Sequence, residues 1–289
     1  MQSEKMNIQW YPGHMTKTRR QIEADLKQVD AVCEIVDARI PIASRNPDID
    51  SICAGKPRIV ILNRMDLADP EATKRWVAYF KSKGMAAVPT DCKSRKGIND
   101  FQPAVRAVLK EKIERDAARG MNRPLRVMVV GIPNVGKSTL INQVSGRKGA
   151  KAENRPGVTR GKQWVTVDNG LLLLDTPGIL WPKFEDPEVG MTLAYTGAVK
   201  DGILDIEELA CRLMEVLHKR YPHALQERYG IEAEEGTPGY ELLEMAGRKR
   251  GFLVARGEIN TERMAKVLLD EFRSGKLGRF TLEEPVEEF

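Results

Sequence analysis

Three short motifs in this chain contain residue types that bind phosphate groups and purine rings. The motif Asn63-Arg64-Met65-Asp66 comes first, Gly131-Ile132-Pro133-Asn134-Val135-Gly136-Lys137-Ser138 comes second, and Asp175-Thr176-Pro177-Gly178 comes third. The second has the glycine, lysine and serine spacing of a loop that wraps around phosphate. The first offers an amide and a carboxylate that can read a base. Together the motifs predict a nucleotide site.

The second motif predicts a phosphate-binding loop between a strand and a helix. Its glycines let the backbone approach a phosphate, and the positive end of the helix dipole favours the negative charge. In this interpretation Lys137 bridges the β- and γ-phosphates, and the Ser138 hydroxyl is a ligand of Mg²⁺. The alternative is a chance glycine-rich turn, which the strand before the motif and the helix after it disfavour. The N–H groups expected to face the phosphates belong to Asn134, Val135, Gly136, Lys137, Ser138 and Thr139.

The third motif predicts a switch that senses the terminal phosphate. Asp175 would hold Mg²⁺ through a water molecule. The N–H of Gly178 can approach the γ-phosphate because no side chain blocks it, and that bond exists only with a triphosphate. Upstream, Thr159 is the expected threonine of a second switch, with its hydroxyl on the metal. The alternative is that Thr159 is an ordinary loop threonine.

The first motif predicts selectivity for guanine. The Asp66 carboxylate would accept hydrogen bonds from N1–H and the exocyclic amine of guanine, whereas adenine presents only a lone pair at N1. Arg64 stands where the usual motif has lysine, and its apolar stem and flat head could cover the base. Backbone groups of Asp91-Cys92-Lys93 would complete the contacts to the guanine edge; the alternative is a purely structural turn.

Slow hydrolysis is expected from the residue that follows the third motif. Many GTPases have a glutamine there that orients the attacking water, but this chain has Ile179, which has no hydrogen-bonding side chain. His14 is a candidate for aligning the water; equally, it could be exposed or contact RNA on an N-terminal arm. The Asn134 amide oxygen could coordinate K⁺ in place of a positive finger, or it could brace the loop.

Apolar runs precede these motifs along the chain. Buried parallel strands are expected at residues 31–36, 59–62, 127–130 and 171–174, with a weaker strand at 86–90. Each would deliver its candidate site residues at its carboxyl end, where open α/β sheets bind ligands. Amphipathic patterns predict helices at 16–29, 205–218 and 261–272, and a charged helix and linker at 101–121. Asp205 is the expected N-cap of its helix, with Glu208 three residues on.

The order of the motifs predicts a circularly permuted P-loop GTPase fold of the α/β class. In an ordinary small GTPase the guanine-reading motif comes last, but here NRxD precedes GxxxxGKS and DTPG. We expect this domain to span residues 1–187, with an N-terminal arm at 1–15. A small all-helical domain would follow at 188–289. The permutation places the switch strand beside the linker at 182–190, so loss of the γ-phosphate at Gly178 could re-aim the helical domain.

The composition narrows the class of protein. Of the 289 residues, the segment 190–289 carries 14 basic and 19 acidic side chains, so 1–189 carries 32 and 22. A basic body can bind phosphate-rich partners by releasing counterions, or it can be a solvated surface. The four cysteines form no CxxC pair, so a reducing cytoplasm is expected. No apolar run approaches the roughly 20 residues that cross a membrane.

Several motifs resemble those of the YlqF family of circularly permuted GTPases over essentially the whole chain. They are Trp10-Tyr11-Pro12-Gly13-His14-Met15, Asp37-Ala38-Arg39-Ile40-Pro41, the permuted motif order, Asp175-Thr176-Pro177-Gly178-Ile179-Leu180-Trp181-Pro182-Lys183, Tyr195-Thr196-Gly197-Ala198 and Gly278-Arg279. The resemblance implies a cytoplasmic factor in late assembly of the large ribosomal subunit. Such a factor binds ribosomal RNA, is stimulated by the ribosome and by K⁺, and leaves on GTP hydrolysis.

The resemblance also bears on single residues. Members of the family have hydrophobic residues at the glutamine position, in agreement with Ile179, and the histidine matching His14 is implicated in hydrolysis. Arg64 and Cys92-Lys93 depart from the usual pattern, which affects base recognition only. Candidate contacts to RNA phosphates are Lys17, Arg19, Arg20, Arg248, Lys249, Arg250, Lys276 and Arg279.

Two other functions are open at this point. One is an RNA-binding scaffold that holds a structural nucleotide with negligible turnover. The other is a partner in tRNA modification, which normally needs catalytic machinery that this sequence lacks. In the favoured interpretation the partners are GTP, GDP and the large ribosomal subunit with its RNA, and neither a membrane nor DNA is expected.

Overall fold

The computed structural model of this chain divides into two compact units. The first comprises residues 1–187 together with 283–289, and the second comprises residues 188–282. The structure describes residues 15–146, 163–168, 170–176, 178, 187–199, 205–254 and 257–285. The helical unit is therefore joined to the first unit at both of its ends.

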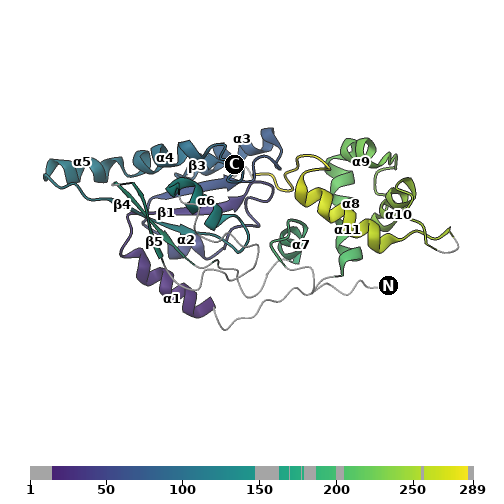
Figure 1. The fold of residues 1–289 in the computed structure, drawn as a ribbon, viewed down its shortest axis with the longest axis horizontal. Helices are drawn as coiled ribbons and strands as arrows, with labels where there is room; N and C mark the ends of the chain where they lie inside the picture. The colour runs from purple at the N-terminus through teal and green to yellow at the C-terminus, as the bar shows by residue number, and fades with distance from the viewer. Residues whose placement is uncertain are drawn as a thin grey trace. The chain divides into compact units, whose positions relative to one another are not determined.

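The first unit is built on a twisted six-stranded sheet (Figure 1). The strand order is β3-β2-β1-β4-β6-β5; β5 pairs antiparallel to β6, and all other neighbouring strands pair parallel. The strand β4 leads into the phosphate loop. It lies between β1, which belongs to the first half of the chain, and β6. The strands are β1 (Ala31–Asp37), β2 (Arg58–Asn63), β3 (Ala86–Pro89), β4 (Leu125–Val130), β5 (Gln163–Asp168) and β6 (Leu171–Asp175).

Helices lie on both sides of the sheet (Figure 1). In the first unit they are α1 (Met15–Leu26), α2 (Ile49–Ile52), α3 (Pro70–Ser82), the short 3₁₀ segment η2 (Ile98–Asp100), α4 (Phe101–Val108), α5 (Lys110–Ala118) and α6 (Lys137–Ser145). On one face of the sheet, Val32 and Met128 pack with residues of α1 and α2. Trp76 and Phe80 of α3 pack with strand residues such as Val36. The strand side chains that point to the opposite face are also buried, which explains the long apolar runs.

The expected strands are confirmed to within a residue or two at each end. The charged stretch after β3 differs from the expectation. Where a charged helix and linker were expected over 101–121, there are two helices, α4 and α5, separated at Leu109. Phe101 and Val105 of α4 are fully buried, whereas α5 has only half-buried or exposed side chains. The break between the two helices therefore falls at Leu109, the last buried residue of this stretch. The antiparallel edge strand β5 was not foreseen.

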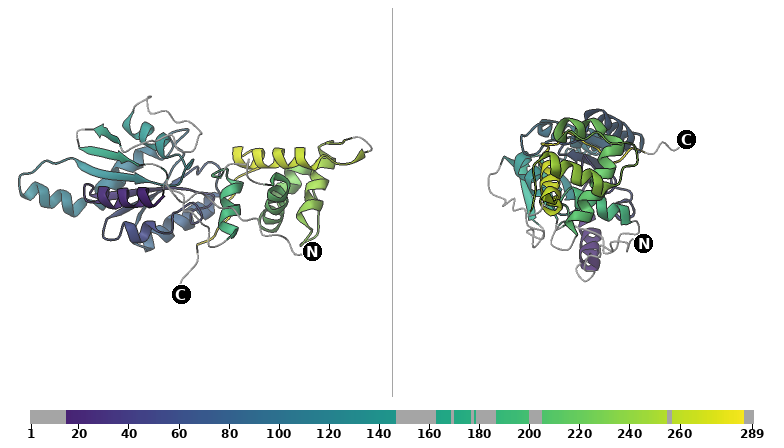
Figure 2. Two further views of the ribbon diagram at one scale, coloured as in Figure 1. Left: turned by 90° about the horizontal axis from the view of Figure 1, so that it is seen from below. Right: turned by 90° about the vertical axis from the view of Figure 1, so that its right-hand side faces the viewer.

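The second unit is helical. Its helices are α7 (Pro187–Tyr195), α8 (Ile206–Arg220), α9 (Pro222–Tyr229), α10 (Gly239–Lys249) and α11 (Thr261–Ser274). Figure 2 shows α11 in yellow beside the green helices α8 and α10, with both of which it is in contact. The Asp205 carboxylate caps α8 as predicted, accepting from the N–H groups of Glu207 and Glu208 at 3.0 and 3.1 Å. The Glu208 carboxylate pairs with Arg212 at 2.9 Å.

A buried carboxylate links the helices of this second unit. Glu271 of α11 is 6% exposed and accepts hydrogen bonds from Arg228, Tyr229 and Arg250, at distances of 2.5 to 2.9 Å. The hydrogen bond from Arg228 is the main reason that the pKa of Glu271 falls to about 2. One side chain thereby joins α11 to α9 and to the end of α10.

The last described residues return to the first unit. The Glu283 carboxylate accepts from the backbone N–H groups of Ile42 and Ala43 at 2.7 and 2.9 Å, and Trp76 Nε1 donates to the Glu283 carbonyl at 3.2 Å. Glu284 forms a forked ion pair with Arg75. The helical unit therefore ends at residue 282, whereas we had expected it to run to 289. The N–H groups of the 40–44 turn, which attract a carboxylate, account for this difference.

None of the helices in the described ranges is both long and apolar enough to cross a lipid bilayer.

Candidate nucleotide-binding site

The strand register gathers the three motifs at one edge of the sheet. Asp37 at the end of β1 is opposite Asn63 at the end of β2, and Asp175 at the end of β6 is opposite Val129 of β4. The phosphate loop begins two residues after Val129. The carboxyl ends of these parallel strands therefore meet where the sequence predicted a ligand site. His14, Thr159 and Ile179 lie outside the described residues.

The glycines of the phosphate loop are required by close neighbours. Gly136 has φ +105°, and a Cβ atom there would lie 2.3 Å from Nδ2 of Asn63. A Cβ atom on Gly131 would lie 2.7 Å from Cγ2 of Ile35. The helix α6 begins at Lys137, so that Ser138 and Thr139, both half-buried, lie in its first turn. The loop thus has the close backbone approach and the helix N-terminus that phosphate binding needs.

Asn63 joins the guanine motif to the phosphate loop. Its Nδ2 donates to the carbonyl of Val135 at 2.8 Å. Its Oδ1 accepts from the N–H of Cys92 at 3.1 Å and from Oγ1 of Thr90 at 3.5 Å. The side chain is 4% exposed. Asn63 therefore holds together three segments that are far apart in the sequence, a role that the motif alone did not reveal.

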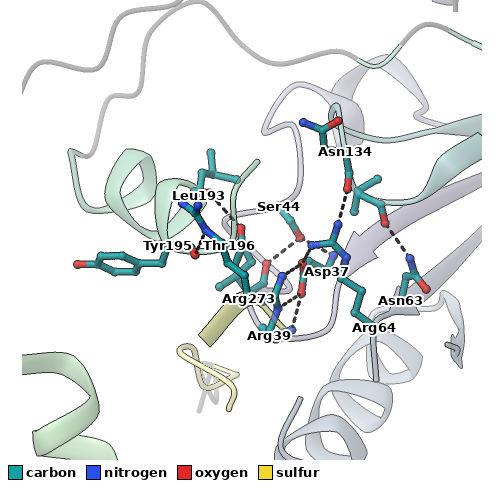
Figure 3. Close-up of polar contacts among 12 residues, drawn as sticks. Asp37, Arg39, Ser44, Asn63, Arg64, Asn134, Leu193, Tyr195, Thr196 and Arg273 are labelled. Atoms are coloured by element: carbon teal, nitrogen blue, oxygen red, sulfur yellow. Dashed lines mark hydrogen bonds and ion pairs between the residues drawn. The ribbon is translucent and has the colours of Figure 1, made fainter. Parts of the chain in front are cut away.

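Arg64 makes a second connection to the phosphate loop (Figure 3). Its Nη2 donates to the carbonyl of Asn134 at 2.7 Å, and its Nη1 pairs with Oδ2 of Asp37 at 3.0 Å. Arg64 and Asn134 both have φ +62°, a backbone conformation that residues other than glycine adopt infrequently. The flat head that we expected near the base is thus held by a carboxylate and by the phosphate loop.

Asp37 is a buried carboxylate surrounded by donors. Its Oδ1 accepts from the backbone N–H and the Nε of Arg39, both at 3.0 Å, and its Oδ2 pairs with Nη2 of Arg39 at 2.7 Å. Burial alone would raise the pKa of Asp37, but the charges of Arg39 and Arg64 outweigh it and lower that pKa to about 2. Asp37 and Arg39 belong to the motif quoted for the family resemblance, but no chemistry had been predicted for them.

Lys137 and Asp175 belong to one centre. Nζ of Lys137 lies 3.0 Å from Oδ1 of Asp175, and both side chains are largely buried. The Asp175 carboxylate and the Ser138 hydroxyl are hard oxygen donors that suit Mg²⁺. The described residues contain no group of three or more histidine, cysteine, aspartate or glutamate side chains that could form a metal cage. That donor set fits an ion that is bound through one or two protein oxygens and the phosphates of a nucleotide.

The third motif lies directly against the phosphate loop. Oγ1 of Thr176 donates to the carbonyl of Val129 at 2.7 Å, which fixes the chain just after Asp175. A Cβ atom on Gly178 would lie 3.0 Å from the backbone nitrogen of Pro133. Any side chain at position 178 would therefore crowd the loop.

The loop that follows β3 is a built turn beside Asn63. Oδ1 of Asp91 accepts from the N–H groups of Lys93 and Ser94 at 2.9 and 3.3 Å. The pKa of Asp91 lies below its ordinary value, because the hydrogen bonds from Ser94 and Lys93 outweigh burial, which would raise it. Burial raises the pKa of the Cys92 thiol to about 11. These bonds are compatible both with a structural turn and with contacts to a guanine edge, and Asp66 is exposed on the neighbouring loop.

This fold and this edge of the sheet define the class of protein. A phosphate loop that opens a helix, an aspartate beside its lysine, and a guanine motif bonded to the same loop are the features of a P-loop GTPase. The order of these parts along the chain is permuted.

Comparison with known proteins agrees with this class. A family described as 50S ribosome-binding GTPase matches residues 126–233. Ribosome biogenesis GTPase A of Bacillus cereus is 47% identical over 98% of this chain and 95% of its own length. GNP-bound YlqF from Thermotoga maritima covers 94% of this chain and 99% of its own, with 30% identity and a TM-score of 0.61. A GDP-bound YlqF structure covers 92% and 99%, with 31% identity and a TM-score of 0.64.

The chain therefore belongs to the ribosome biogenesis GTPase A family. It is a GTPase, an enzyme that converts GTP to GDP and phosphate, and as in GTPases generally its nucleotide binds with Mg²⁺.

Proposed function

We propose that this protein is a GTP-driven assembly factor for the large ribosomal subunit and that it acts in the cytoplasm. The observation that carries the proposal is the 2.8 Å hydrogen bond from Asn63 to the carbonyl of Val135, which joins the guanine motif to the phosphate loop. This bond supports a single site that reads both ends of one GTP molecule. Relatives named for ribosome biogenesis support the biological role.

Each predicted residue has a distinct task in this site. Asp66 reads the guanine edge, and the N–H groups of residues 134–139 face the phosphates. Lys137 neutralises charge on the β- and γ-phosphates. Ser138, Thr159 and Asp175 would hold Mg²⁺, which supplies charge neutralisation on the phosphates when it is bound. Gly178 presents its N–H to the γ-phosphate, and the closeness of Pro133 supports that placement.

Hydrolysis is proposed to be slow until the site is completed. Ile179 offers no group to orient water, so His14 is the candidate for that task when the ribosome holds it in place. The Asn134 side-chain amide is the proposed ligand of K⁺. The left-handed backbone of Asn134, fixed by Arg64, supports a defined position for this residue in the loop.

RNA is the proposed partner of the basic side chains. Arg248 and Lys249 at the end of α10 are exposed and can reach phosphates. Arg250 pairs with Glu271 at 2.8 Å, so its charge already has an acceptor inside the helical unit. The name of the matching family, 50S ribosome-binding GTPase, supports the large subunit as the particle that is bound.

Turnover measurements with purified ribosomal subunits test this function. GTP hydrolysis should be slow alone and should rise at least tenfold with large subunits, whereas small subunits should have no effect. In sedimentation, the protein should travel with large subunits in the presence of a nonhydrolysable GTP analogue and should remain unbound with GDP. If neither subunit stimulates hydrolysis and binding to large subunits does not depend on the nucleotide, the RNA-binding scaffold would be favoured.

A further inference from the structure

We propose that Asp37 is a positioning residue for the nucleotide site and acts through Arg64 on the phosphate loop. The proposal rests on the proposed GTP site. It assigns a task to a buried carboxylate that lies outside the phosphate loop and the guanine motif, although it ends the strand next to each of them.

The geometry of two consecutive peptide groups shows what Arg64 does in the loop. The Asn134 carbonyl accepts from Nη2 of Arg64, and the next carbonyl, that of Val135, accepts from Nδ2 of Asn63. In a trans peptide the C=O and the following N–H point in opposite directions. Holding these two carbonyls therefore turns the N–H groups of Val135 and Gly136 the other way, toward the side where phosphates would bind.

Asp37 determines where the Arg64 guanidinium lies. Arg64 has a long flexible side chain that is 31% exposed, so that it would sample many rotamers without a partner. Asp37 is 3% exposed and is itself held by the Arg39 side chain and by the Ser44 hydroxyl, which accepts from the Asp37 N–H at 2.9 Å. A rigid, ionised carboxylate thus fixes one nitrogen of the guanidinium and leaves the other for the Asn134 carbonyl.

The left-handed backbone of both partners supports this role. Arg64 and Asn134 each have φ +62°, and such residues persist only where the surroundings hold them. The bond between Arg64 and the Asn134 carbonyl links the two strained positions directly. A carboxylate that acted only in folding would not need to be connected to the phosphate loop through this pair.

A double-mutant cycle on the full chain tests the proposal, with GDP and Mg²⁺ as the probe. Asp37→Asn and Arg64→Met should each weaken GDP binding about tenfold, equivalent to about 1.4 kcal/mol. Because Asp37 acts through Arg64, the double variant should bind GDP about as weakly as Arg64→Met alone. Arg64→Lys should recover part of the affinity, since its ammonium can still reach the Asn134 carbonyl. Calorimetric titration measures all four variants.

Glu34→Gln is the matched control. Glu34 is a carboxylate on the same strand, 2% exposed, and it is paired with Arg45 and Arg58 rather than with Arg64. This variant should lower the melting temperature and leave GDP affinity within twofold of wild type. When it is combined with Arg64→Met, the changes in binding free energy of the two substitutions should be additive. If Asp37→Asn does not fold, Asp37→Glu, which retains the charge but misplaces it, takes its place in the cycle.

The outcomes separate this proposal from the nucleotide site itself. Unchanged GDP affinity in the Asp37 variant would overturn the positioning role, and so would an effect that adds fully to that of Arg64→Met. In both cases, GDP binding by the wild-type protein would still support the proposed nucleotide site. Failure of the wild-type protein to bind GDP would overturn both.

Discussion

At the scale of single residues, we propose that Asp66 determines which base is preferred. Its carboxylate is exposed three residues after the end of β2, next to Met65, whose N–H donates to the carbonyl of Thr90 at 3.0 Å and fixes the backbone there. An exposed carboxylate with a fixed backbone can accept the two donors of a guanine edge without rearrangement.

Asp66→Asn should therefore change the base that is preferred. The amide can donate to a carbonyl at the position where guanine has its amine, so that xanthine nucleotides should bind more tightly than guanine nucleotides. We expect GDP affinity to fall at least tenfold and XDP affinity to rise. Competition titrations with both nucleotides measure the change, and unaltered selectivity would refute the assignment of the base reader.

Gly136→Ala tests the packing of the guanine motif against the phosphate loop. The added Cβ would lie 2.3 Å from Nδ2 of Asn63, so the loop must shift and GDP binding should fall more than tenfold. Gly84→Ala is the matched control, because it also has positive φ (+75°) but has nothing within 4 Å of the added atom. The control should cost about 1–2 kcal/mol of stability from its backbone alone and should retain full GDP affinity. Equal affinities in both variants would contradict the loop geometry.

The side-chain contacts of the site were the part that the sequence could not predict. Asn63 and Arg64 were placed in the right motif, but their bonds reach Val135 and Asn134, about seventy positions away. Such contacts depend on the register of β1, β2 and β4, which no local pattern contains. The residue types indicated which groups could bind a nucleotide. The fold determined which of these groups form hydrogen bonds with one another.

At the scale of helices and strands, prediction succeeded where burial was uniform. Strands such as β1 and β4 are largely apolar because both faces of the sheet are covered, with Glu34, Asp37 and the exposed Arg126 as the exceptions, so their limits were easy to recognise. The edge strand β5 has the sequence QWVTVD with half-buried and exposed positions, and it was missed for that reason. The break between α4 and α5 was missed because both segments have helical composition and differ only in what they bury.

The Glu271 network should make the helical unit sensitive to acid. Its folded pKa of about 2 lies below its ordinary value of 4.5. Its ionised form therefore stabilises the fold above pH 4.5, and this contribution is lost as pH falls toward 2. Glu271→Gln should remove most of this pH dependence. Hydrogen exchange of the amides of α8 and α11, measured from pH 7 down to pH 3, reports on this unit alone.

Glu262→Gln is the control on the same helix. Glu262 forms an exposed pair with Lys266, so its removal should change stability little at any pH. If wild type and Glu271→Gln respond to acid in parallel, the buried carboxylate is not what stabilises these helices.

At the scale of the whole molecule, the chain connects the helical unit to the GTPase unit twice. It leaves the GTPase unit at residue 187, nine positions after Gly178, and re-enters it at Glu283. The permuted order thus places the DTPG motif, the proposed sensor of the γ-phosphate, just before the first connection. The 40–44 turn, which receives Glu283, is bonded through the Ser44 hydroxyl to Asp37, the carboxylate that pairs with Arg64.

Exchange of GTP for GDP should therefore alter how the helical unit is held. We expect X-ray scattering profiles of the free protein to differ between the GDP state and a nonhydrolysable-analogue state. The physical reason is that the proposed bond from the Gly178 N–H would exist only with a γ-phosphate. Superimposable profiles at saturating nucleotide would contradict this coupling.

The most direct test of the central claim is a crystal structure of the protein with GDP and Mg²⁺. The base should be within hydrogen-bonding distance of the Asp66 carboxylate, while the β-phosphate of the same molecule rests on the N–H groups of residues 135–138 beside Lys137. A nucleotide bound elsewhere, or one that touches only Asp66 or only Lys137, would show that the permuted motifs do not form one site.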